Sequence, residues 1–189
     1  MAPNSEMFAE AHGYPCSPVG IHVTSASSGS TKRLTLGCRV DGTRRNDRLE
    51  GTEWSDVMSG RRGADRIVGF GSADQIFGGP GNDRINGGPY SDDDEGDLID
   101  GGPGNDVLDG GNAQQADYGV YDDVLYGRSG NDGLRGGPGR DILDGGPGND
   151  TIQARDGGRD EVRCGPGNDL ALVDRRDHVA RDCEHVRRR

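Results

Sequence analysis

The sequence is poor in the residues from which most protein cores are built. Of its 189 residues, 30% are hydrophobic and 5% aromatic, whereas 29% are charged and the formal net charge is −11. A chain of this kind usually buries too little apolar surface to offset the entropy lost on ordering. Composition alone therefore predicts disorder. The acidic excess also argues against nucleic acid as a partner, because affinity for phosphates depends on Lys and Arg.

Long apolar segments are also missing. No apolar run approaches the roughly 20 residues that a membrane-spanning helix requires. The opening stretch MAPNSEMFAEAHGYP lacks the apolar core of a secretory signal. We therefore expect no membrane span and recognise no signal peptide in the chain. The terminal Arg187, Arg188 and Arg189 are expected to form a solvated basic tail.

Common catalytic motifs are absent. Neither the HExxH pattern of zinc proteases nor the GxSxG pattern of lipase-type nucleophiles occurs. His178 and His185 lie seven residues apart near the C-terminus, a spacing that we interpret as two exposed polar residues. No enzymatic activity is expected.

Cysteine is scarce, and its spacing excludes the usual zinc motifs. The four cysteines are Cys16, Cys38, Cys164 and Cys183, and none belongs to a CxxC pair. Four cysteines allow three pairings, and the lower entropy of closing short loops favours Cys16 with Cys38 and Cys164 with Cys183. Free buried thiols are the alternative. Disulfides would imply an oxidising compartment.

What the chain has in abundance is glycine at a fixed spacing. From Gly42 it divides into GTRRNDRLE, GTEWSDVMS, GRRGADRIV, GFGSADQIF and GGPGNDRIN, with Gly first, Asp sixth and an apolar residue eighth. The consensus is GGxGxDxUx, where U is a large apolar residue. Two longer units, at 87–100 and 110–126, begin with the glycines of the consensus, end with its Asp and apolar residue, and carry an insertion between them. The pattern becomes less regular after residue 154. A fixed period of this kind predicts a stack of repeats with degenerate ends.

Each repeat predicts one tight turn and one short strand. The six residues before each apolar position are rich in Gly and Pro, which favours a turn over a helix. The single apolar residue, flanked by positions that face outward, predicts a three-residue strand with one inward side chain. The inward residues are Leu49, Met58, Ile67, Ile76, Ile85, Ile99, Leu108, Leu125, Leu134, Leu143 and Ile152.

Two repeats complete one coil, so alternate repeats lie above one another at the inter-strand spacing of about 4.8 Å. Their aspartates then stack in two rows along the two edges of the coil. The first row is Asp47, Asp65, Asp83, Asp106, Asp132, Asp150 and Asp169. The second row is Asp56, Asp74, Asp97, Asp123, Asp141, Asp160 and Asp177. Both insertions fall on the second edge.

Stacked carboxylates repel one another unless a hard cation lies between them. Calcium takes six to eight oxygen ligands and suits oxygen-only turns, whereas magnesium demands stricter geometry. No His or Cys lies in the turns to favour a transition metal. The turns nearest to the consensus predict the strongest sites between Asp83 and Asp106, Asp132 and Asp150, and Asp150 and Asp169. The early turns carry basic residues that we expect to replace the ion as counter-charge, namely Arg44, Arg45, Arg61 and Arg62.

Over roughly residues 42 to 180 the pattern resembles the RTX family, the nonapeptide repeats-in-toxin proteins. The resemblance implies an all-β, right-handed parallel β-roll or β-solenoid, here with disulfide-tied end caps, that folds on binding several Ca²⁺ ions through Asp and turn carbonyls. Because the chain has cysteines and no separate catalytic domain, it looks most like the small repeat-only members. The aspartates assigned to metal are Asp65, Asp74, Asp83, Asp97, Asp106, Asp123, Asp132, Asp141, Asp150 and Asp169. The glycines assigned with them are Gly79, Gly81, Gly102, Gly104, Gly137, Gly139, Gly146 and Gly148.

The expected organisation is an N-terminal cap over residues 1–41, calcium-binding repeats over 42–163, and degenerate last repeats with a C-terminal cap over 164–189. The expected function is calcium binding in an extracellular scaffold. One alternative is a structural or adhesive surface protein that uses the roll as a rigid spacer towards an unidentified protein or surface partner. Another is a metal-independent solenoid in which Arg and Asp pair between coils.

Overall fold

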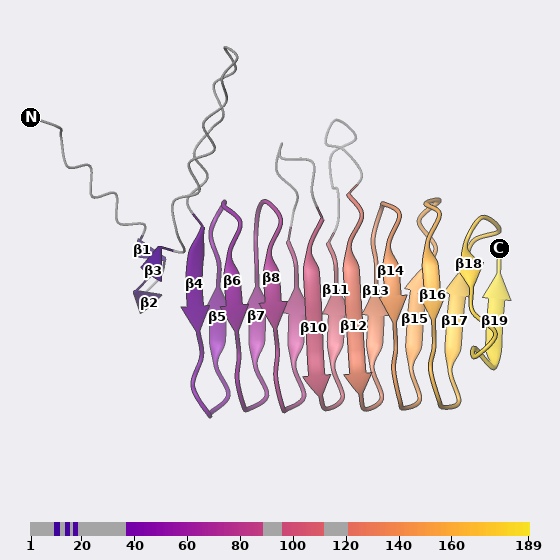
Figure 1. Ribbon diagram of the computed structural model, residues 1–189, viewed down its shortest axis with the longest axis horizontal. Coiled ribbons are helices and arrows are strands. Elements are labelled where there is room, and N and C mark those ends of the chain that lie inside the picture. The colour runs from indigo at the N-terminus through magenta and orange to yellow at the C-terminus, as the bar shows by residue number, and fades with distance from the viewer. Residues whose placement is uncertain (1–9, 12–13, 16, 19–36, 89–95, 112–120) are drawn as a thin grey trace, which may run out of the picture.

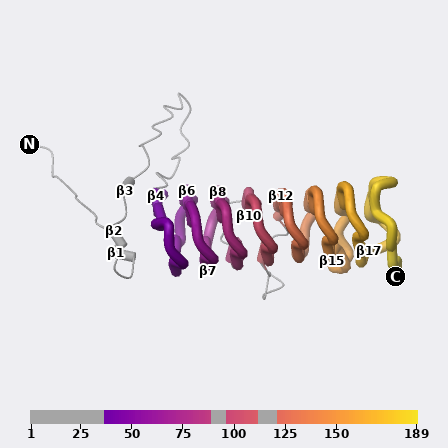
Figure 2. Tube along the Cα trace, turned by 90° about the horizontal axis from the view of Figure 1, so that it is seen from below, coloured from indigo at the N-terminus to yellow at the C-terminus, as the bar shows by residue number. Residues whose placement is uncertain are grey.

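The chain is wound into a flattened coil whose turns stack along one axis (Figures 1 and 2). The computed structural model describes residues 10–11, 14–15, 17–18, 37–88, 96–111 and 121–189. Regular structure within these ranges consists of strands alone. The same ranges contain no helix that is long and apolar enough to span a bilayer.

Two parallel sheets form the opposite faces of the coil (Figure 1). The first contains β4 (Cys38–Asp41), β6 (Val57–Ser59), β8 (Gln75–Phe77), β10 (Leu98–Pro103), β12 (Val124–Ser129), β14 (Ile142–Asp144), β16 (Glu161–Arg163) and β18 (His178–Val179). The second contains β5 (Arg48–Glu50), β7 (Arg66–Val68), β9 (Arg84–Asn86), β11 (Val107–Asp109), β13 (Gly133–Arg135), β15 (Thr151–Ala154), β17 (Leu170–Val173) and β19 (His185–Arg188). Before them, β1 (Glu10–Ala11) pairs with β2 (Tyr14–Pro15), and β3 (Ser17–Pro18) pairs with β4, both antiparallel.

The register confirms the coil of two repeats. Leu49 of β5 lies opposite Ile67 of β7, which is 18 residues later and therefore two repeats on. Where a unit is longer, the pairing absorbs the extra residues, so that Ile99 of β10 pairs with Leu125 of β12. The insertions themselves fall outside the described residues. A parallel β-roll is therefore the fold of this chain.

The core is a single column of apolar side chains between the two sheets. All the inward residues predicted from the eighth position are buried, with at most 2% of the surface of each exposed. Val40, Val162 and Ala171 extend the same column towards both ends. One side chain per strand makes a thin core, so the turns must contribute to stability.

Both ends of the stack differ from the regular repeats. β4 begins it, as expected from the stretch around Cys38, whereas β19 was not predicted. Arg187 and Arg188 belong to β19, so the expectation of a basic tail was wrong for them, although their side chains are exposed. The last strand forms because parallel pairing with β17 satisfies its backbone groups.

The cysteine prediction is confirmed at the C-terminal end. Cys164 and Cys183, which are 19 residues apart, form a disulfide across the last coils. Cys38 is disulfide-bonded too, and its predicted partner Cys16 lies outside the described residues.

Candidate metal-binding turns

The turns place the aspartates in the two rows that the repeat predicts. In the first row, the backbone N–H of Asp65 donates to Oδ1 of Asp83 at 2.7 Å, and that of Asp132 donates to Oδ1 of Asp150 at 2.8 Å. The same bond joins every successive pair in the row. The second row is built alike, from Asp56 to Asp177. One carboxylate oxygen of each aspartate thus holds the neighbouring coil in register.

The other carboxylate oxygen defines the site. In nine turns Oδ2 is buried and has no hydrogen-bond partner in the structure, at Asp65, Asp74, Asp83, Asp106, Asp132, Asp141, Asp150, Asp160 and Asp169. Buried polar atoms are normally hydrogen-bonded, and a buried charge without a partner is costly. A row of such oxygens is a donor set suited to a hard cation such as calcium.

Burial makes the charged form of these aspartates unfavourable without a cation. Desolvation, reinforced by the neighbouring carboxylate of Asp97, raises the pKa of Asp74 to about 9. Desolvation and the charge of Asp123 raise the pKa of Asp97 to about 8. In the first row, burial raises the pKa of Asp106 to about 7. Each raised pKa indicates a carboxylate that requires either a proton or a metal ion.

Glycine allows the turn carbonyls to approach from coil to coil. At Gly104, φ is 150° and a Cβ atom would overlap the carbonyl oxygen of Gly81 in the preceding coil. All the predicted glycines except Gly139 have positive φ, a conformation that side chains disfavour. The predicted glycines therefore lie in the turns beside the aspartate rows.

At the N-terminal end of each row, a threonine that the sequence analysis did not identify donates hydrogen bonds to the first aspartate. Oδ2 of Asp56 accepts hydrogen bonds from the backbone N–H of Thr52 at 2.5 Å and from its hydroxyl at 3.1 Å. Oδ2 of Asp47 likewise accepts hydrogen bonds from the backbone N–H of Thr43 at 2.6 Å and from its hydroxyl at 2.9 Å. The signal was present, because only these two turns carry Thr at the second position, where the consensus has Gly.

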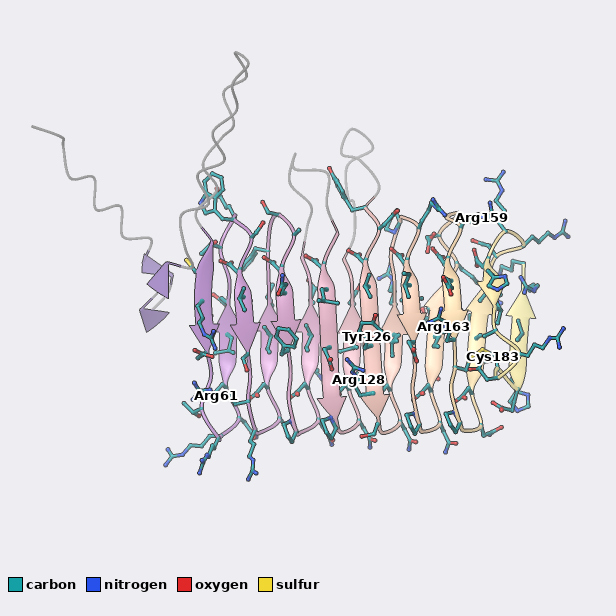
Figure 3. The ribbon with its side chains drawn as sticks, in the orientation of Figure 1. Arg61, Tyr126, Arg128, Arg159, Arg163 and Cys183 are labelled. Atoms are coloured by element: carbon teal, nitrogen blue, oxygen red, sulfur yellow. A yellow bond between two sulfur atoms is a disulfide. The ribbon has the colours of Figure 1, made fainter. Side chains whose placement is uncertain are left out.

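The predicted arginine counter-charges do not take this role in the rows. Arg61 lies 3.7 Å from Asp41, which precedes the first row. Arg61 also occupies the second turn position with φ of 74°, and its side chain extends at the edge of the early coils (Figure 3). Threonine hydrogen bonds thus do what was expected of arginine, because a short side chain reaches back to the carboxylate within its own turn.

The two rows end differently at the C-terminal end of the stack. The backbone N–H of Asp169, which ends the first row, donates to the side chain of Glu184 at 3.1 Å. Oδ2 of Asp177, which ends the second row, accepts the backbone N–H of Asp174 at 2.5 Å. The chain itself thus satisfies the carboxylate of Asp177, whereas Oδ2 of Asp169 is still without a partner.

A parallel roll with stacked aspartate turns defines a class of repeat protein built around rows of carboxylates. The RTX calcium-binding nonapeptide repeat matches this chain in four copies, at residues 41–69, 63–89, 91–113 and 117–154, which together cover more than half of it. The chain therefore belongs to the RTX calcium-binding nonapeptide repeat family. A search of curated proteins found no match. The family and the stacked aspartates together support calcium binding.

Proposed function

We propose that this protein is a calcium-stabilised extracellular scaffold without catalytic activity, in which several Ca²⁺ ions lie between successive aspartate turns. The observation that carries the proposal is the pair of rows of buried, unpartnered Oδ2 atoms. The ligands would be the ten aspartates and the turn glycines assigned from the sequence, with Asp160 added by the structure. Bound calcium would supply positive charge and coordinate oxygens that the protein leaves unsatisfied.

Calcium binding and folding are coupled in this proposal. The unfolded chain cannot present stacked turns, so the free energy of ion binding contributes directly to folding. The thin core makes this contribution necessary, since one apolar side chain per strand buries little surface. In the absence of calcium, neighbouring carboxylates within each row would repel one another when charged.

The extracellular location rests on one observation and one expectation. The Cys164–Cys183 disulfide is typical of oxidising compartments. Modules with weak calcium sites, in the range of about 0.1 to 1 mM, function where calcium is abundant, outside the cell. A scaffold role follows from a regular coil without any recognised catalytic motif.

The test is far-ultraviolet circular dichroism of the oxidised full chain in chelator, followed by separate titrations with calcium and magnesium. We expect a coil-to-β transition with calcium at about 0.1 to 1 mM, and none at equal magnesium. Asp150→Asn should shift the midpoint to higher calcium, whereas Asp47→Asn, whose carboxylate is held by Thr43, should leave it in place. A β spectrum that persists unchanged in chelator would instead establish the metal-independent solenoid.

A further inference from the structure

We propose a calcium site of three carboxylates, formed by Asp141, Asp156 and Asp160, that the nine-residue repeat does not specify. It rests on the proposed function and extends it, because Asp156 lies outside both aspartate rows. It also lies beyond the last matched repeat, which ends at residue 154.

The three side chains meet at one turn of the second edge. One carboxylate oxygen from each lies within 4.8 Å of the other two. Asp141 and Asp160 are each 1% exposed, and Oδ2 of each is buried without a hydrogen-bond partner. The two are joined by the backbone N–H of Asp141, which donates to Oδ1 of Asp160 at 2.9 Å. The site therefore combines two buried carboxylates, each with one unpartnered oxygen, and a third, exposed carboxylate.

An irregular turn brings Asp156 to this position. The unit at 154–163 has one residue more than the consensus, and the longer turn lies at the edge marked by Arg159 in Figure 3. The backbone N–H of Gly158 donates to Oδ1 of Asp156 at 2.8 Å, and that of Gly157 donates to Asp174 in the next coil at 2.9 Å. The turn is thereby fixed on both sides.

Gly158 also explains how the longer turn stays close to the preceding coil. A Cβ atom there would overlap the carbonyl oxygen of Gly139. The close approach keeps Asp156 beside Asp141, although the two belong to successive coils. Because Asp156 is exposed, an ion can reach the three carboxylates from solvent.

A third carboxylate should make this the tightest site of the second edge. Calcium affinity rises with the number of charged ligands, and the regular turns bring only two stacked aspartates together. Asp174 and Asp177 add negative potential at Asp156, whereas Arg135 opposes it. The first ion to bind the second edge should therefore bind here.

The experiment is calorimetric titration of the full oxidised chain with calcium, comparing wild type with Asp156→Asn and Glu161→Gln. Glu161 is the matched control, since it adjoins Asp160 but pairs with Arg163 on the outer face. We expect Asp156→Asn to weaken the tightest binding step at least about tenfold, on the scale of losing a partner at a metal site. Glu161→Gln should leave that step unchanged, although it removes the same charge.

A crystal structure with calcium supplies the second measurement. We expect an ion within about 2.3 to 2.6 Å of an oxygen from each of the three side chains. Equal titrations for wild type and Asp156→Asn, or an ion that contacts Asp141 and Asp160 but not Asp156, would overturn this site alone. Wild-type protein that binds no calcium at all would overturn the proposed function as well.

Discussion

Thr52 and Asp56 form a closed unit within one turn, in which both the N–H and the hydroxyl of the threonine donate to the carboxylate. Thr52→Val removes the hydroxyl bonds and keeps the backbone bond. We expect a loss of about 1 kcal/mol in the unfolding free energy of the calcium-saturated protein, typical of one hydrogen bond. Denaturant unfolding measures it, and Thr151→Val, at an exposed strand position, is the control. An unchanged unfolding free energy would show that the hydroxyl adds nothing to the backbone bond of Thr52.

The stability of the metal-free roll should fall as pH rises. Burial raises the pKa of Asp141 to about 8 and that of Asp160 to about 7, whereas an unfolded aspartate titrates near 3.9. The folded state therefore holds these protons more tightly. Their stabilisation is complete below about pH 4 and is lost progressively as pH rises to the folded pKa values of about 7 and 8.

The measurement is far-ultraviolet circular dichroism in calcium-depleted buffer between pH 5 and pH 9, where we expect the β signal to decrease as pH rises. In saturating calcium the trend should reverse, because protons and calcium compete for the same oxygens. A β signal independent of pH in depleted buffer would contradict the burial of ionisable rows.

Phe70 and Phe77 offer a test of strain in the turns. They are 40% and 38% exposed, but Phe70 occupies a turn with φ of 80° and Phe77 lies in strand β8. Phe70→Gly should raise the unfolding free energy by up to about 1 kcal/mol by relieving the left-handed conformation. Phe77→Gly should lower it by a similar amount, since glycine weakens a strand. If denaturant unfolding showed that both substitutions change the unfolding free energy in the same direction, strain at Phe70 would be ruled out.

The C-terminal disulfide should hold the last coils in place. Cys164→Ala combined with Cys183→Ala is expected to lower the unfolding free energy by about 3 kcal/mol, given a loop of 19 residues. Calcium-saturated protein is unfolded with denaturant, without reductant, so that the disulfide at Cys38 stays intact. An unchanged midpoint would show that the packing of β17 and β19 suffices alone.

The regular part of the molecule was predictable because every repeat meets the same environment. An apolar residue every nine positions sets which side chain faces inward, and a shift of one residue would expose the whole column. From that register alone, Leu49 could be placed beneath Ile67, and Asp132 beside Asp150. The period thus determined the coil, the core and both aspartate rows.

The irregular contacts were decided by the tertiary structure. Glu184 reaches the backbone of Asp169, β19 extends the sheet, and Asp156 joins Asp141 from the next coil. Glu184, β19 and Asp156 do not recur at the nine-residue spacing, so no alignment of the sequence with itself predicts their contacts. The sequence by itself determined the recurring features, namely the coil, the core and the aspartate rows, because the same nine-residue pattern specifies every repeat. The contacts that occur only once were decided by the tertiary structure, because their residues become neighbours only when the regular repeats have stacked into coils.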